Sequence, residues 1–187
     1  MLGVLVGACP TAQEAEMFKE LDINCFSCVP PYNQEGAREA LESPKSRETI
    51  AAMVQEFQRR CDFVVPALNG IEGVSCQTPR GAFYVFPNIA ALCKRLGVLD
   101  AYESLPDNTR SATSPSTLFQ MFLLFRYQVA TMDRRAFGRI AAEGKHYLRI
   151  SIATGMDDLR EAVRRIEQAA ADKGGFRSFV TEGEHLC

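Results

Sequence analysis

Apolar residues recur at three- and four-residue spacing along several stretches of the chain, and this spacing predicts amphipathic helices. The longest stretch begins near Ser46, after a break at Ser43-Pro44, and its apolar stripe consists of Ile50, Met53, Val54, Phe57, Cys61, Val64, Val65 and Leu68. Pro66 lies within it and predicts a kink or an early end, because proline lacks a backbone N–H and clashes with the preceding turn. Further helices are predicted from a capping box at Thr11 and Glu14, over Tyr32 to Leu41, over Ile89 to Leu96, over Ser116 to Phe125, and from a cap at Thr154 and Asp157 to Gly174-Gly175.

Shorter apolar runs rich in β-branched and aromatic residues predict strands. They are Leu2 to Val6, Val74 to Gln77, Ala82 to Phe86, Gln128 to Met132 and Lys145 to Thr154. The second and third are joined by hairpin-like turn residues. Three stretches are predicted to lack both helix and strand: an extended segment from about Ile23 to Pro31, an exposed loop from Leu105 to Pro115, and the tail after Gly175. Together these elements predict an α/β or α+β architecture.

A single arginine, Arg149, lies in the middle of the last predicted strand. Strand alternation gives one polar face and one apolar face, with Tyr147, Arg149 and Ser151 on the first and Leu148, Ile150 and Ile152 on the second. A guanidinium in a half-buried strand requires an anion, and its planar fork matches a carboxylate through two parallel hydrogen bonds. The residues alone leave two interpretations open: a structural ion pair with a carboxylate of the chain, or a site for an anionic ligand.

Composition narrows the classes of partner. The 187 residues carry 21 basic and 23 acidic side chains, a formal net charge of −2 with both signs scattered. This balance gives no attraction for nucleic acid or an anionic membrane, so small molecules or other protein chains are the expected partners. The seven cysteines are spread without a framework, which is typical of reduced thiols in the cytoplasm. Cys25 and Cys28 form a lone C-x-x-C without a second pair or a spaced histidine, so no metal site is predicted.

Three segments of the chain carry a resemblance to a known family. They are I-E-G-V-S-C-Q-T-P-R-G-A-F-Y-V-F-P at residues 71–87, V-A-T-M-D-R-R-A-F-G at 129–138 and Y-L-R-I-S-I-A at 147–153. In order and separation they resemble the C-terminal part of the fold type I pyridoxal-phosphate (PLP) aminotransferases, the aspartate aminotransferase-like class. The resemblance implies an α/β fold with an α+β small domain, in which helices pack on short strands. It also implies that residues 1–31 are the last strand and helix of a large PLP-binding domain and that residues 32–187 are the small domain.

The resemblance also assigns residues of a site. In that family the arginine of the R-I-S strand binds the α-carboxylate of the amino acid, so this role is implied for Arg149, and the ligand interpretation is favoured over the structural ion pair. Phe83 is implied to line the substrate pocket, and Phe137 and Gly138 are implied to belong to a turn that borders it.

The chain departs from the family pattern just before that turn. Where many relatives have proline, glycine and a small residue, this chain has Asp133, Arg134 and Arg135. Charged side chains replace a glycine that tolerates positive φ, so a different turn geometry is expected.

The activity implied by the resemblance is transfer of an amino group between an α-amino acid and a 2-oxo acid, with PLP as cofactor. Such enzymes join PLP to a lysine as a Schiff base, and no lysine of this chain has the surroundings for that role: Lys19, Lys45, Lys94, Lys145 and Lys173. The family's lysine loop precedes a strand start that matches Met1-Leu2-Gly3. PLP binding is therefore expected to be incomplete in this chain, which alone is not expected to be catalytically competent.

Two alternatives stay open. One is another PLP reaction such as a β-lyase, and the other is a non-catalytic, truncated module that pairs with another chain. A cytoplasmic homodimer is implied where the large domain is present.

Overall fold

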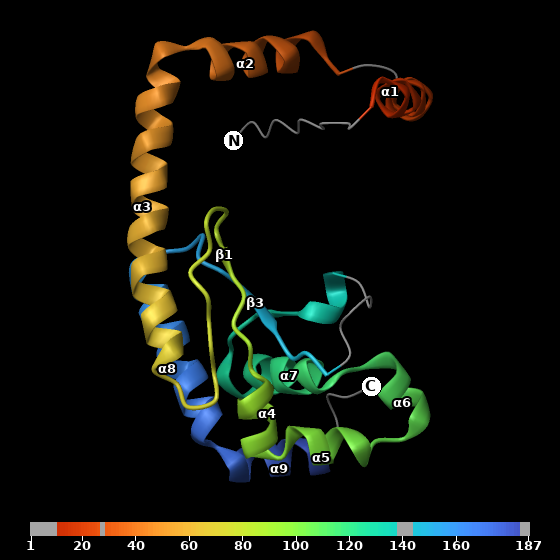
Figure 1. Ribbon diagram of the computed structural model, residues 1–187, viewed down its shortest axis with the longest axis vertical. Coiled ribbons are helices and arrows are strands. Elements are labelled where there is room, and N and C mark those ends of the chain that lie inside the picture. Colours follow the sequence, from red (N-terminus) through yellow and green to blue (C-terminus); the bar gives the residue numbers. More distant parts are fainter. Residues whose placement is uncertain (1–10, 27–28, 138–143, 184–187) are drawn as a thin grey trace. The chain divides into compact units, whose positions relative to one another are not determined.

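The computed structural model describes residues 11–26, 29–137 and 144–183 (Figure 1). The strand predicted from Leu2 to Val6 lies outside these residues. By its internal contacts the chain divides into two compact units, Met1–Val54 and Gln55–Cys187. The domain boundary predicted after residue 31 stays a prediction.

The first described helix, α1 (Ala12–Phe26), begins at the predicted capping box, which is confirmed. The Glu14 N–H donates to Thr11 Oγ1 at 3.2 Å, and the Thr11 N–H donates to Glu14 Oε2 at 3.1 Å. The extended segment predicted from Ile23 is wrong as far as Phe26, where α1 ends. The steric restriction that proline imposes acts on the residue directly before it, so the prolines at 30 and 31 do not prevent helix at residues 23–26.

Two prolines start the next two helices, α2 (Pro31–Glu42) and α3 (Pro44–Asn69). Proline suits the first helical position because its missing N–H would have no intrahelical partner there. Ser43 between them is extended, with φ −61° and ψ 131°, as the residue before a proline favours. The predicted break is confirmed.

Of the two outcomes predicted at Pro66, a kink or an early end, the early end is wrong, because α3 continues to Asn69, and the kink stays a prediction. Proline removes one backbone hydrogen bond, but buried side chains on both sides of Pro66 hold this part of the helix in the core. These side chains are Cys61, Val64, Val65 and Leu68.

The second unit combines a small sheet with six further helices in the described residues (Figure 1). The strands are β1 (Tyr84–Val85), β2 (Met132–Asp133) and β3 (Leu148–Ser151). The helices are α4 (Ala90–Leu96), α5 (Val98–Glu103), α6 (Asp107–Ala112), α7 (Pro115–Tyr127), α8 (Met156–Ala171) and α9 (Lys173–Glu182), with the 3₁₀ helix η1 (Arg134–Phe137) after β2. The strand order is β1-β3-β2 with antiparallel pairs, so β3 is central.

The predicted strand pair before α4 is only partly present. Ser75 forms a single antiparallel bridge with Asn88, and β1 pairs with β3 rather than with the Val74 to Gln77 segment. The predicted hairpin is therefore confirmed only at this bridge, and Val85 of the second segment is buried where β1 pairs with β3. Similarly, only Met132 from the predicted strand at Gln128 to Met132 lies in β2.

Helix α7 forms the centre of the core, as its apolar sequence predicts. The Ser114 side chain caps it by accepting from the Thr117 N–H at 3.0 Å. It packs against α4, α5 and α8. The Phe122 ring lies 5.3 Å from that of Phe176 and 5.6 Å from that of Phe179, which ties α7 to α9.

Three local predictions in this unit are wrong: the loop before α7, the N-cap of α8 and the end of α8. The loop predicted from Leu105 to Pro115 contains α6, whose exposed polar residues give no hydrophobic period for a sequence pattern to detect. Gly155, and not Thr154, is the N-cap of α8, and the Thr154 hydroxyl donates to Asp158 instead, at 2.8 Å.

Helix α8 also ends earlier than predicted, at Ala171, and Gly174-Gly175 lie inside α9. The Asp172 side chain starts α9 by accepting from the Gly175 N–H at 2.7 Å. Burial of Phe176 and Phe179 compensates for the low helix propensity of two glycines. The tail therefore carries a helix that the sequence pattern did not indicate.

Candidate functional site

Strand β3 has the two-faced character that its sequence predicts. Leu148 and Ile150 are buried, Arg149 is half-buried and Ser151 is exposed. Because β3 is central, both of its neighbours contribute side chains to the open face that carries Arg149. Met132 of β2 lies opposite Arg149, and Tyr84 of β1 lies opposite Ser151.

The Arg149 guanidinium is held between two aromatic rings. Its Cζ lies 4.3 Å from the ring centroid of Tyr84 and 4.6 Å from that of Phe137. Nη2 donates to the sulfur of Met132. A guanidinium carries five N–H groups, so those not used by the Met132 contact can donate the two parallel hydrogen bonds that a carboxylate accepts.

Within the described residues, Arg149 forms no ion pair with an aspartate or a glutamate. Ten other arginines there do pair with carboxylates or donate to carbonyl oxygens of the chain: Arg38, Arg59, Arg60, Arg95, Arg110, Arg126, Arg135, Arg160, Arg164 and Arg165. The described residues therefore offer Arg149 no carboxylate for the structural ion pair that was the alternative interpretation. The arrangement suits an anionic group supplied from outside.

The other residues implied by the resemblance differ in their relation to Arg149. Phe137 is in contact with it. Phe83 instead contacts Phe57, at 5.9 Å between ring centroids, and Tyr84, at 4.4 Å. Gly138 lies outside the described residues. The pocket-lining roles stay predictions.

Tyr84 is the contact that sequence reasoning missed. Alternation in the A-F-Y-V-F segment puts Phe83 and Tyr84 on opposite faces, but the face of each depends on the register with β3. The pairing of Tyr84 with Ser151 settles this register and brings Tyr84 to the Arg149 side.

The charged turn at Asp133, Arg134 and Arg135 forms without a residue of positive φ. Asp133 ends β2, and the two arginines start η1. The Arg135 guanidinium donates to the carbonyl oxygens of Thr113 and Ser111, which fixes the segment between α6 and α7. Charged side chains thus make the turn through contacts with a neighbouring loop.

Asp133 itself is buried on the opposite side of the sheet from Arg149. Cross-strand partners share a face and successive residues alternate, so Asp133 lies on the face of its partner Leu148. Its Oδ2 accepts from the hydroxyls of Ser114 at 2.9 Å and Thr117 at 2.8 Å. Its Oδ1 has no hydrogen-bond partner in the described residues.

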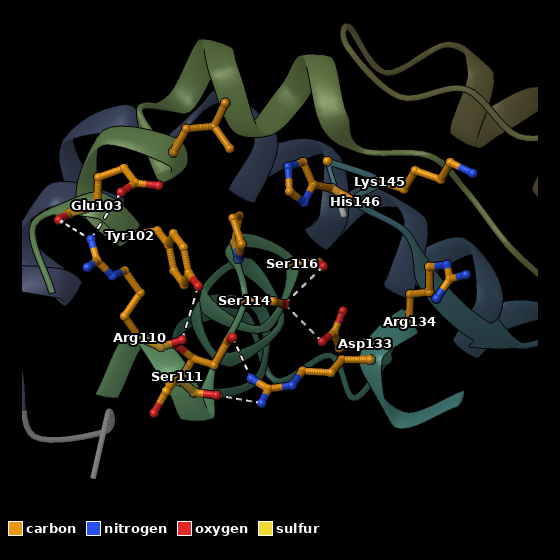
Figure 2. Close-up of a pocket in the computed structure, with 15 residues that line it drawn as sticks. Tyr102, Glu103, Arg110, Ser111, Ser114, Ser116, Asp133, Arg134, Lys145 and His146 are labelled. Atoms are coloured by element: carbon orange, nitrogen blue, oxygen red, sulfur yellow. Dashed lines mark hydrogen bonds and ion pairs between the residues drawn. The ribbon is translucent and has the colours of Figure 1, made fainter. Parts of the chain in front are cut away.

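A cavity of about 530 Å³ opens beside Asp133 (Figure 2). It lies between α5, α6, the start of α7, the turn after β2 and residues 144–146, and Arg149 is not among its lining residues. His146 lines it and is half-buried. Burial lowers the pKa of His146, and the charge of Asp133 partly offsets this effect.

Within the described residues there is no cluster of three metal-ligating side chains, and no helix there has the length and hydrophobicity that a bilayer span requires. Cys25, Cys61, Cys76 and Cys93 are free thiols. The partner of Cys25 in the C-x-x-C, Cys28, lies outside the described residues.

The fit of PLP to this chain is partial. A PLP enzyme needs a lysine that reaches the cofactor next to the bound substrate. The three strands that form the open face around Arg149 contain no lysine. Lys145 precedes β3, and its side chain points away from the cavity in Figure 2. The residues around Arg149 fit a substrate carboxylate and do not fit the covalent anchor of PLP.

Known proteins share both the sequence and the fold of the chain. No protein-family model matches it. The probable aspartate/prephenate aminotransferase of Aquifex aeolicus (strain VF5) is 34% identical over 171 residues, which make up 90% of this chain and 38% of that protein. The crystal structure of the aspartate aminotransferase from Rhizobium meliloti has a TM-score of 0.63 and 30% identity, over 84% of this chain and 35% of that one. An aromatic aminotransferase from Pyrococcus horikoshii OT3 also has a TM-score of 0.63, with 29% identity over 82% of this chain and 34% of that one.

Over the region that it shares with these proteins, the chain is related to the fold type I aminotransferases. Within them it is related to the aspartate aminotransferase-like enzymes. The relationship predicted from the three sequence segments is confirmed, and so is the fold class of helices packed on a short sheet. The chain spans little more than a third of the length of these relatives.

Proposed function

We propose that this chain forms the carboxylate-binding part of an aminotransferase active site, in which Arg149 binds the α-carboxylate of an amino acid and of a 2-oxo acid. The observation that carries the proposal is the position of the Arg149 guanidinium and its lack of a carboxylate partner in the described residues. Its guanidinium lies on the open face of the sheet between Tyr84 and Phe137, without a carboxylate partner in the described residues. Both substrates of a transamination carry the group that such a guanidinium binds.

The names of the relatives support this reaction class. The proteins from Aquifex aeolicus and Rhizobium meliloti are aminotransferases by name, and the residues that carry the resemblance include the strand of Arg149. When bound, PLP supplies the electron sink for the chemistry at the α-carbon. In the proposal the contribution of this chain is to hold and orient the substrate carboxylate.

The lysine that anchors PLP is proposed to come from outside residues 1–187. This part of the proposal rests on the open face of the sheet, which offers an arginine and aromatic rings but no lysine. The chain alone is then expected to bind PLP weakly or not at all. An absorbance band of lysine-bound PLP that persists after dialysis and is lost in one lysine variant of this chain would contradict it.

The role of Arg149 can be tested in a chimera in which this chain replaces the matching region of the Aquifex aeolicus relative. In Arg149→Lys, KM for amino acids is expected to rise and kcat/KM to fall about ten- to a hundredfold, because a point charge cannot reproduce two parallel hydrogen bonds. Arg164→Lys is the matched control, since Arg164 is exposed on α8 and pairs with Glu161. Equal kinetics of the two variants would contradict the proposed role.

The same chimera separates the alternatives. Release of pyruvate from β-chloroalanine without amino transfer would favour the β-lyase, and a folded chimera that binds PLP but has neither activity would favour a non-catalytic module. No contact in the described residues favours either over the aminotransferase. The homodimer and the cytoplasmic location stay predictions from the sequence.

A further inference from the structure

The ring of Tyr84 lies against Arg149, although the resemblance assigns the neighbouring Phe83 to the substrate pocket. The Arg149 Cζ lies 4.3 Å from the centroid of the Tyr84 ring. Within the described residues the Tyr84 hydroxyl forms no hydrogen bond. The contact with Arg149 is therefore made by the ring and not by the hydroxyl.

The strand ladder fixes the position of this ring. Tyr84 pairs with Ser151, which shares a face of β3 with Arg149, and β1 lies beside β3 in Figure 1. The Phe83 ring also packs against the Tyr84 ring, with 4.4 Å between the centroids. A long arginine side chain samples many rotamers when nothing restrains it, and a ligand that must order it binds more weakly. A ring that is held by the sheet can order the arginine in advance.

The contacts that restrain Arg149 leave its charge without a carboxylate partner in the part of the chain that the structure describes. Phe137 adds a second ring, with its centroid 4.6 Å from the Arg149 Cζ, and Met132 adds a sulfur acceptor. Aromatic rings attract a guanidinium through their electron-rich faces, but they do not neutralise it as a carboxylate does. The side chain is therefore ordered before a ligand binds, while its charge remains for an anion.

We propose that Tyr84 is a positioning residue of the carboxylate site, and that its ring orients the Arg149 guanidinium before the substrate binds and stays against it in the complex. The inference rests on the proposed function of Arg149. Tyr84 acts only through Arg149, so its effect on affinity requires both the ring and the guanidinium. The role differs from what the resemblance implies, which concerns Phe83 and not Tyr84.

The first test is NMR on the full 187-residue chain, with isocaproate as a probe that carries a carboxylate and no amino group. The Arg149 Nε–H signal, identified by its loss in Arg149→Lys, is expected to shift in a saturable manner. Nuclear Overhauser contacts between the Tyr84 ring and the Arg149 side chain are expected with and without isocaproate. Their absence, or their loss when isocaproate binds, would overturn the positioning role. A signal that does not shift would overturn the proposed function of Arg149, and this inference with it.

Variants of Tyr84 show whether the ring carries the effect. Tyr84→Leu is expected to weaken isocaproate binding about five- to thirtyfold, because one of the rings that order Arg149 is lost. Tyr84→Phe keeps the ring and is expected to bind as the unaltered chain does. Phe63→Leu is the matched control, since it removes a different ring–guanidinium contact, 5.8 Å from the Arg160 Cζ. Equal affinities of Tyr84→Leu and Phe63→Leu, or equal losses in Tyr84→Leu and Tyr84→Phe, would overturn the role of the ring.

A double-mutant cycle in the chimera separates this inference from the proposed function. Arg149→Met removes the guanidinium, so adding Tyr84→Leu to it is expected to change kcat/KM for amino acids by less than about twofold. Additive losses would show that Tyr84 acts elsewhere, which overturns the positioning role and leaves the role of Arg149 intact. Unchanged kinetics in Arg149→Lys would instead contradict the proposed function.

Discussion

The two units of the chain place apolar residues at the same helical spacing but bury them very differently. In residues 11–25 and 29–54 no side chain is buried, and Phe18, Leu21 and Val54 are more than half exposed. In the second unit the residues of the α3 apolar stripe from Cys61 to Leu68 are almost fully buried, and Phe122 of α7 has no exposed surface. Periodicity therefore predicted helices in both units, although not α5, α6 or α9, and only in the second unit did it also predict a core.

The difference separates helix formation from helix stability. A capping box and spaced apolar residues favour a helix in either unit, but most of the stability of a helix comes from packing its apolar side. The second unit supplies that packing, because α7 meets α4, α5 and α8. The apolar residues of the first unit are not covered by any described residue of that unit, so changes there should cost little in this chain.

Thiol reactivity should show the largest difference between the units. Cys25 of α1 is exposed, whereas Cys93 of α4 is fully buried, and burial raises the pKa of its thiol to about 12. Because the thiolate is the reactive form, a raised pKa slows alkylation at pH about 8. We expect iodoacetamide to modify Cys25 at least about a thousandfold faster than Cys93, as measured by peptide mass spectrometry. The two should react alike in concentrated guanidinium chloride, and equal rates without denaturant would contradict the burial of Cys93.

Removal of one aromatic ring from each unit should show the next largest difference. Phe122→Ala leaves a cavity among Tyr127, Phe176 and Phe179 and is expected to lower the free energy of unfolding by about 3–5 kcal/mol. Phe18→Ala is the matched control, and because Phe18 is 65% exposed its effect should stay within about 0.5 kcal/mol. Urea unfolding followed by circular dichroism measures both. A larger loss from Phe18→Ala would show that α1 is packed in solution.

The smallest effect is expected from a matched pair on one helix. Val64 is 1% exposed and Val54 is 60% exposed, and both belong to the stripe of α3. Val64→Ala is expected to lower the free energy of unfolding by about 2 kcal/mol, from two buried methyl groups and the space they leave. Val54→Ala should be close to neutral, because alanine also has the higher helix propensity. The same urea unfolding experiment measures both variants. An equal decrease in the free energy of unfolding would mean that Val54 is buried in solution as Val64 is.

Much of the site could be predicted from sequence, because it depends on local rules. Alternation alone put Arg149 on the polar face of its strand, since successive side chains of a strand point to opposite faces. The three segments 71–87, 129–138 and 147–153 indicated the family, which the relatives confirm. The capping box at Thr11 and the end of α4 at Gly97, which adopts a left-handed conformation, also follow from local chemistry.

Other features arise from contacts between segments far apart in the chain, so no local rule could predict them. Helix α9 forms despite Gly174-Gly175 because Phe176 and Phe179 are buried against α7. Tyr84 reaches Arg149 only through the register between β1 and β3, and Asp133 meets Ser114 and Thr117 only because β2 lies against α7. The sequence by itself determined that an arginine would lie on the polar face of a strand and require an anion. The tertiary structure decided which aromatic rings hold it and that a buried carboxylate lies on the opposite face, because both depend on which elements pack together.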